Sequence, residues 1–400
     1  MNVPIPHVVL SIRLLADGGC ILQISARENK VRPVMERIPS ADVRAAAAAA
    51  RESLRDSVRW GAIGERIGRQ DPSSWHDALF RAGNSLLMDL VGPNVAGGPL
   101  DKIRTFFSQV RTAFGGGTLR LEMKSPIDFP IEIIPVRAGR PDFHSLRGDE
   151  LLAKATSYFL GLQFAISRIL PSSQVLPQSL MLQSGPSGKV TIAPFAHRDF
   201  VSIRKLHAEF HASESGRYTV LPLLPDEKNE SDLNVDRFAD LLMQAGSNAI
   251  VSIAAHGIVD GRAANDVGLL FWGKPARDVV TVGHLNASMA ALPPRAEVPT
   301  GPLGILNCCG IAHRPFDAPS NVVDAFVRAG YRSVLAPVVP INIPMAANFT
   351  RLVLTELLAD ETTLEDALLR SRRALIRDWS NPVGLLYVAY GATRIQAAHT

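Results

Sequence analysis

Cysteine is scarce in this chain of 400 residues, which contains only Cys20, Cys308 and Cys309. A sparse, odd set of cysteines argues against a disulfide framework and is typical of proteins kept in a reducing compartment. Long apolar runs are also missing, because no window approaches the roughly 18 apolar residues that a membrane span requires. The first apolar stretch, VVLSIRLL, carries Arg13 and indicates a strand, not a signal peptide. We therefore expect a soluble, cytoplasmic protein without a membrane partner.

A strong excess of charge is equally absent, since the formal net charge is only +4. No block of basic residues with interleaved aromatics is present, so we expect no nucleic-acid partner. Apolar residues make up 46% of the chain and charged residues 20%. This balance allows a sizeable core and excludes wholesale disorder.

Motifs for metal ions and phosphates are incomplete. His207 and His211 lie four residues apart, but Glu209 is two residues from each and falls on the opposite side of a helix, unlike the zinc-peptidase motif H-E-x-x-H. We interpret this segment as a solvated helix face. The segment 185–189 has its glycines too close together for a phosphate loop and precedes a strand, so we interpret it as a turn. No cofactor is expected.

Apolar periodicity divides the chain into three segments, at residues 1–72, 75–180 and 186–396. The first is expected to hold a hairpin, at 8–15 and 20–26, and an alanine-rich helix that begins near Ser40. The second is expected to hold helices at 76–90, 100–113 and 149–168 and a strand at 118–123. The third is expected to hold strands at 190–196, 218–224, 248–255, 301–309, 333–339 and 384–391, with helices at 202–213, 234–246, 318–329, 345–359 and 364–377.

Strands that alternate with helices predict an α/β sandwich with a mostly parallel sheet, preceded by a smaller α+β region. Residues 75–170 have too few strands to bury a large core, so we expect them to pack on the last segment. Reactive groups collect at the carboxyl ends of parallel strands. Two expected strands end at reactive side chains: 248–255 runs into His256 and Gly257, and 301–307 runs into Cys308, Cys309 and Gly310.

A cysteine nucleophile needs a base or ion-pair partner within hydrogen-bond reach to become a thiolate. Cys309 follows His256 by 53 residues, close to the spacing of about 50 in the caspase signature, of which residues 307–310 are a partial match. Taken singly, the histidine is better interpreted as structural and the two cysteines as small buried residues. Their joint occurrence at two strand ends favours a catalytic dyad. No compelling partner is evident for His197, His284 or His313.

Residues 248–391 resemble the CHAT domain, a family of caspase-like and separase-like cysteine peptidases. The family pattern is a small residue with His-Gly after one strand, Leu-Ser-Ala-Cys after a second, a helix ending in Ala-Gly, and a strand beginning Ser-Val. Here these stand as Ala255-His256-Gly257, Leu306-Asn307-Cys308-Cys309, Ala329-Gly330 and Ser333-Val334. Residues 129–134 resemble the Pro-Trp-Glu segment of the amino-terminal half of such domains. The departures are the Asn-Cys pair before Cys309, and Val339 where the family often has tryptophan, which bears on the substrate groove.

The resemblance implies a cysteine endopeptidase that cleaves a protein substrate. Aligned without gaps, the family motif makes Cys309 the nucleophile and places its alanine at Cys308, while His256 protonates the leaving amine. Backbone N–H groups at Gly257 and Gly310 would hold the oxyanion. The resemblance also suggests a latent enzyme that a regulatory protein or ligand activates, with a role in prokaryotic antiviral defence or cell death. The alternative is a catalytically idle caspase-like scaffold that acts by protein–protein interaction through residues 1–70.

Overall fold

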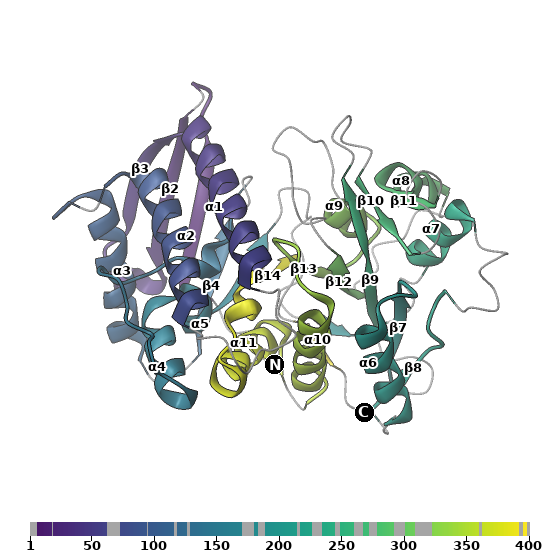
Figure 1. Cartoon of the computed structure of the whole chain (residues 1–400). Helices are drawn as coiled ribbons and strands as arrows, with labels where there is room; N and C mark the ends of the chain where they lie inside the picture. Colours follow the sequence, from purple (N-terminus) through teal and green to yellow (C-terminus); the bar gives the residue numbers. More distant parts are fainter. Residues whose placement is uncertain are drawn as a thin grey trace. The chain divides into compact units, whose positions relative to one another are not determined.

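The computed structural model describes most of the chain, in two compact units (Figure 1). The described residues are 6–17, 19–61, 73–93, 95–115, 118–125, 129–169, 180–182, 189–213, 217–225, 234–244, 249–259, 267–271, 278–291, 301–308, 322–359, 362–391 and 395–397. Unit 1 comprises Met1–Pro171 and Leu368–Leu386, and unit 2 comprises Ser172–Ala367 and Tyr387–Thr400. These two units do not correspond to the segments expected at 1–72, 75–180 and 186–396, whose status as separate domains stays a prediction.

Unit 1 is a five-stranded sheet with helices. Its elements are β1 (Val8–Leu14), β2 (Gly19–Ala26), β3 (Val34–Pro39), α1 (Ser40–Gly61), α2 (Ser73–Val91), α3 (Pro99–Phe114), β4 (Leu119–Lys124), α4 (Gly148–Tyr158), α5 (Leu160–Gln163), β5 (Phe164–Ile169) and the larger part of α11 (Leu364–Trp379). The strand order is β5-β4-β1-β2-β3. The β5–β4 and β4–β1 pairs are parallel, and the β1–β2 and β2–β3 pairs are antiparallel, which confirms the expected N-terminal hairpin.

Side-chain patterning explains why these elements form. Buried and half-buried residues alternate along β1 and β2, as they do in a strand with one face on the core. In α3 the buried residues recur every three or four positions, which gives the helix one apolar face. The helices α1, α2 and α3 lie on one face of the β1–β2–β3 sheet (Figure 1).

Unit 2 carries the alternating pattern expected from the sequence. Its elements are β6 (Leu180–Leu182), β7 (Val190–Ala196), α6 (Val201–Ala212), β8 (Tyr218–Val220), α7 (Val235–Gln244), β9 (Ile250–Val259), β10 (Val267–Leu270), β11 (Val279–Thr281), α8 (Val282–Ala291), β12 (Leu303–Cys308), α9 (Val322–Arg328), β13 (Ser333–Pro337), α10 (Ile343–Leu357), β14 (Tyr387–Gly391) and β15 (Ile395–Ala397). The strands β8, β7, β9, β12 and β13 are joined by parallel pairing, whereas β14, β10 and β11 join antiparallel.

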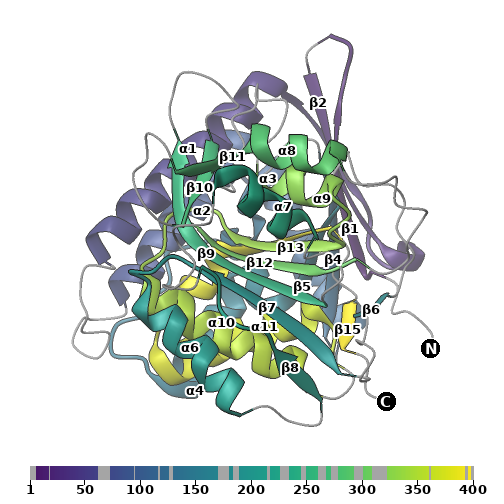
Figure 2. The same cartoon turned by 90° about the vertical axis from the view of Figure 1, so that its right-hand side faces the viewer.

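Helices cover both faces of the unit 2 sheet. Figure 2 shows α6 and α10 on one face and α7, α8 and α9 on the other. Every residue of β12 is buried, as expected for a central parallel strand that reads as a continuous apolar run. This arrangement confirms the predicted α/β fold with a mostly parallel sheet, and it confirms 248–255 and 301–309 as neighbouring parallel strands over their described residues.

Several expected elements were wrong in part. The strand expected at 218–224 ends at Val220, and the strand expected at 384–391 begins at Tyr387, because Pro382–Leu386 form a 3₁₀ turn. The helix expected at 149–168 is divided at the extended residue Phe159 into α4, which ends at Tyr158, and the short α5, which ends at Gln163. Phe164–Ile169 forms β5, because parallel pairing with β4 decides the conformation of this segment. The strand expected to end at Ala255 continues to Val259, because β10 supplies an antiparallel partner for its last four residues.

Candidate active site

Parallel pairing brings the two sequence motifs to the same end of the sheet. In the β9–β12 ladder, Asn307 lies opposite Ala254 and Cys308 lies opposite Ala255. His256 is therefore the residue of β9 that directly follows the last described pair between β9 and β12. Cys309, Gly310 and His313 lie outside the described residues, so their positions stay predictions.

His256 lies where β9 changes partners. Residues 250–254 pair with β7, and from His256 onward the strand pairs with β10, with His256 opposite Leu270 and Gly257 opposite Leu269. The side chain of His256 is exposed. The expectation that His256 directly follows a strand end was thus wrong, but the residue does stand at the end of the parallel ladder.

Two aromatic side chains that sequence reasoning did not connect with the site lie against His256. The ring centroids of His197 and His256 are 4.6 Å apart at an interplanar angle of 76°, and those of Phe200 and His256 are 4.7 Å apart at 73°. Both come from the turn between β7 and α6, and both are buried, with exposures of 5% and 4%. The β7–β9 pairing, which ends at Ala196 opposite Ala254, places this turn beside His256.

Cys308 lies on the other face of the sheet from His256. Side chains alternate along a strand, so Ser252, Ala254 and His256 share one face of β9. That face is the one covered by α6, because Ser252 Oγ contacts His207 Nε2 at 3.1 Å. Cys308 pairs with Ala255 and takes the opposite face, where it is 1% exposed and its Sγ lies 3.9 Å from the carbonyl oxygen of Ile253.

A buried polar network fixes the strand just before the cysteines. Asn307 Nδ2 donates to Thr350 Oγ1 of α10 at 2.9 Å, and Tyr387 Oη of β14 donates to Asn307 Oδ1 at 2.9 Å. All three side chains are nearly inaccessible. Because both amide groups of Asn307 are satisfied, a polar residue is tolerated at the centre of this sheet. The asparagine that departs from the family pattern therefore has a structural role here.

His207 does not lie on a solvated helix face, as the sequence suggested. Its side chain is 2% exposed and packs from α6 onto Ser252 of β9, whereas His211 is exposed. Burial lowers the pKa of His207 to about 4. The expectation was wrong because a spacing of four residues identifies a shared face but does not tell whether the sheet covers it.

This buried histidine predicts a specific dependence of stability on pH. Between pH 6.5 and about 4, His207 is protonated in the unfolded chain but neutral in the folded chain. Proton binding therefore favours the unfolded chain, so the folded chain is fully stable above pH 6.5 and loses stability as the pH falls toward 4. The full loss is about 3 kcal/mol, from 1.36 kcal/mol per pKa unit. Urea unfolding from pH 7 to 4 should show a shallower decline for His207→Leu than for wild type, while the exposed control His211→Asn keeps the wild-type slope. If the free energy of unfolding declines equally with pH in all three proteins, the buried His207 does not cause the decline.

A buried ion triad organises the interior of unit 1. Glu132, in the short 3₁₀ turn Ile131–Ile133, accepts from Arg168 Nη2 of β5 at 2.6 Å and lies 3.5 Å from Arg372 Nη2 of α11. The exposures of these side chains are 4% or less. The guanidinium groups also donate to the carbonyl oxygens of Phe129 and Gly384, at 2.9 and 3.1 Å. Glu132 belongs to the segment that resembles Pro-Trp-Glu, and this structure gives it a role as a counter-ion.

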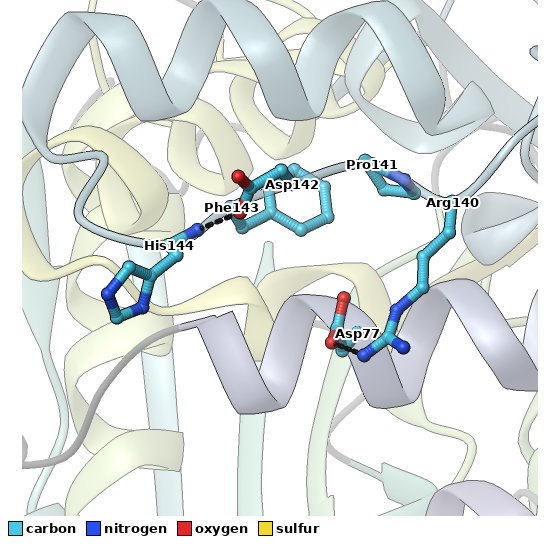
Figure 3. A pocket seen from close by; sticks show the side chains of 6 residues that line it. All are labelled: Asp77, Arg140, Pro141, Asp142, Phe143 and His144. Atoms are coloured by element: carbon cyan, nitrogen blue, oxygen red, sulfur yellow. Dashed lines mark hydrogen bonds and ion pairs between the residues drawn. The ribbon is translucent and has the colours of Figure 1, made fainter.

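One pocket in unit 1 contains none of the expected site residues (Figure 3). It has a volume of about 360 Å³ and is lined by Asp77, Arg140, Pro141, Asp142, Phe143 and His144. Asp77 and Arg140 form an ion pair, and Asp142 accepts from the backbone N–H of His144 at 2.9 Å.

Within the described residues, no three or more His, Cys, Asp or Glu side chains are grouped to hold a metal ion. No helix in the described ranges is long and apolar enough to cross a membrane.

Comparison with known proteins gives one family and several distant structures. The CHAT domain family model matches residues 134–387, which is more than half of the chain. The separase of the Saccharomyces cerevisiae separase–securin complex is similar in fold, with a TM-score of 0.50 and 11% identity over 98% of this chain; this chain spans only 30% of the separase chain. Gingipain RgpB of Porphyromonas gingivalis gives a TM-score of 0.43 and 10% identity over 76% of this chain and 71% of that one. No curated protein sequence matches.

Proposed function

Because the chain belongs to the CHAT domain family, we propose that it is a cysteine endopeptidase with Cys309 as its nucleophile and His256 as the partner of that thiol. The observation that carries this proposal is the register of β9 and β12. Their last described pair is Ala255 with Cys308, and the next residue along the sequence is His256 after Ala255 and Cys309 after Cys308. A fold of the caspase-like type, with both motifs at one end of a parallel sheet, is consistent with this chemistry.

The two described cysteines are poor candidates for the nucleophile. Cys20 is fully buried in β2 of unit 1, and Cys308 is 1% exposed on the face opposite His256. A buried thiol in apolar surroundings resists ionisation and is inert. Because side chains alternate along a strand, the residue after Cys308 is expected on the face of His256. Cys309 is therefore the cysteine that suits the role.

The proposed reaction is acyl transfer to the thiol followed by hydrolysis. The Cys309 thiolate attacks the peptide carbonyl, and the imidazolium of His256 gives its proton to the leaving amine as the C–N bond breaks. Water then attacks the resulting thioester, with His256 accepting its proton, and releases the acid and the free thiol. The exposure of His256 suits this role because the substrate must reach it. We assign the oxyanion to backbone N–H groups at Gly257 and Gly310, where the lack of a side chain leaves room for the substrate backbone.

Regulation and biological role are further proposals that rest on family membership. We propose a protein substrate, a latent state released by a regulatory protein or ligand, and a role in prokaryotic antiviral defence or cell death. The small number of cysteines suits a reducing, cytoplasmic setting.

Covalent labelling tests the assignment of the nucleophile. A peptidyl acyloxymethyl ketone, followed by peptide mapping of the folded protein, should modify Cys309 alone, because Cys20 and Cys308 are inaccessible. All three cysteines should react with iodoacetamide after unfolding in urea, which provides the internal control. Labelling should be much slower in His256→Gln. Modification at Cys308 in the folded protein would contradict the assignment, and a protein that is never labelled would favour the idle scaffold.

A further inference from the structure

We propose that His197 and Phe200 are positioning residues for His256, and that their rings hold its imidazole ready to pair with the nucleophile. The inference rests on the proposed function, in which His256 is the partner of a cysteine. It gives a role to two buried aromatic side chains that lie outside the sequence motifs around His256 and Cys309. We call His197 and Phe200 the ring clamp.

Both rings of the ring clamp lie against His256. Both rings lie nearly perpendicular to the imidazole, at centroid distances of 4.6 and 4.7 Å, which is a favourable edge-to-face geometry. The two clamp rings also contact each other, at 5.3 Å. Because His256 is itself exposed, its ring would otherwise be free to sample several rotamers. A catalytic group needs a fixed orientation, since a misplacement of about 1 Å can reduce a rate by about 100-fold.

Backbone bonds hold the clamp in place. The N–H of His197 donates to the carbonyl oxygen of Ala254 at 2.7 Å, which ties the turn to β9 two residues before His256. His197 Nδ1 accepts from the N–H of Asp199 at 3.1 Å, and the N–H of Phe200 donates to the carbonyl oxygen of His197 at 3.0 Å. The turn is therefore fixed independently of His256, as a positioning element must be.

His197 is suited to sit beside a histidine that must carry a positive charge. An Nδ1 that accepts a hydrogen bond carries no proton, so the bond to Asp199 selects a neutral ring. Burial lowers the pKa of His197, and the neighbouring His256 lowers it further. The other charged groups that act on His197 are Asp199, which opposes this shift, and Arg198 and Arg204, which add to it. A neutral His197 leaves the positive charge to His256, where an ion pair with a thiolate requires it.

The rate at which iodoacetamide alkylates Cys309, measured from pH 5 to 9, tests the clamp in the full-length protein. An ion-paired thiolate reacts well below pH 8.5, the usual pKa of a cysteine, whereas an unpaired thiol does not. We expect His197→Gln and Phe200→Leu to slow alkylation at pH 6.5 by about tenfold or more. Their pH profiles should move toward that of His256→Gln. His197→Phe, which restores a ring, should recover most of the rate lost in His197→Gln.

Matched controls separate positioning from stability. His284 Nδ1 accepts from the N–H of Thr281 at 3.1 Å, a bond like that of His197. Phe210 contacts Tyr218 in a tilted arrangement at the C-terminal end of α6. His284→Gln and Phe210→Leu should keep the wild-type profile even where they lower Tm. If His256→Gln slows alkylation and the clamp variants behave like these controls, the inference is wrong and the proposed function stands. If His256→Gln has no effect, the proposed function fails and the inference fails with it.

Discussion

Replacing Cys309 by alanine is expected to reduce peptide hydrolysis by on the order of 10⁶-fold, the loss seen when a serine peptidase is deprived of its nucleophile. Neither of the two described cysteines can take over the reaction, because Cys20 and Cys308 are both buried. Cleavage of a fluorogenic peptide library, assayed with and without candidate activators, measures the effect. The folded state should persist, so the urea midpoint of Cys309→Ala should stay near that of wild type.

Cys308→Ala is the matched variant one residue away. It removes a small buried side chain from the centre of the sheet and is expected to lower the free energy of unfolding by about 1 kcal/mol, the typical effect of a single substitution. Turnover should remain close to wild type, because the Cys308 side chain faces away from His256. An inactive Cys308→Ala beside an active Cys309→Ala would reverse the assignment.

Local patterns were sufficient for the elements around the site. The run Ile250–Ala255 is apolar and rich in β-branched residues, and Leu303–Leu306 is apolar, as buried parallel strands require. The two strands pair in parallel as predicted. Their parallel direction follows from the alternation of strands and helices, because parallel strands in such folds are joined by crossover connections that usually contain helices.

Tertiary pairing decided what local patterns could not. The sequence after His256 contains Gly257 and reads as a strand end, yet the antiparallel partner β10 extends the strand to Val259. The nearness of His197 to His256 depends on β7 lying beside β9, and nothing in the sequence around His197 marks it. The one available signal was position, since His197 directly follows a buried strand, as His256 follows the parallel ladder.

The ion triad shows the same limit over a longer range. Glu132, Arg168 and Arg372 are spread over 240 residues of sequence, and no spacing rule connects them. Arg372 belongs to unit 1 although it lies near the end of the sequence, so the triad joins Glu132 and Arg168 to α11. That residues 75–170 do not form a free domain stays a prediction. A fragment that begins at residue 180 would leave Arg372 without its carboxylate.

Removing the carboxylate of Glu132 is expected to be the most destabilising single change in unit 1. Glu132→Gln removes the carboxylate that both Arg168 and Arg372 contact in the interior, although the volume of the side chain is kept. Breaking a buried ion pair in this way typically costs about 3–5 kcal/mol, a large part of the 5–15 kcal/mol by which domains are stable. Burial is unfavourable for the charge of Arg372 and lowers its pKa, and Glu132 only partly opposes this effect.

Urea unfolding of Glu132→Gln measures this loss, with Glu122→Gln as the matched control. Glu122 pairs with Lys124 on β4 at 2.8 Å, but Lys124 is half exposed. Exposed pairs contribute about 1 kcal/mol or less, so the control should remain near wild type. The double variant Glu132→Gln with Arg372→Met should regain part of the stability, because it also removes one of the two buried guanidinium charges that Glu132 contacts. If the free energy of unfolding of Glu132→Gln lies within about 1 kcal/mol of wild type, the level expected of an exposed pair, charge does not hold the triad together. The carbonyl oxygens of Phe129 and Gly384 would then suffice for the two guanidinium groups.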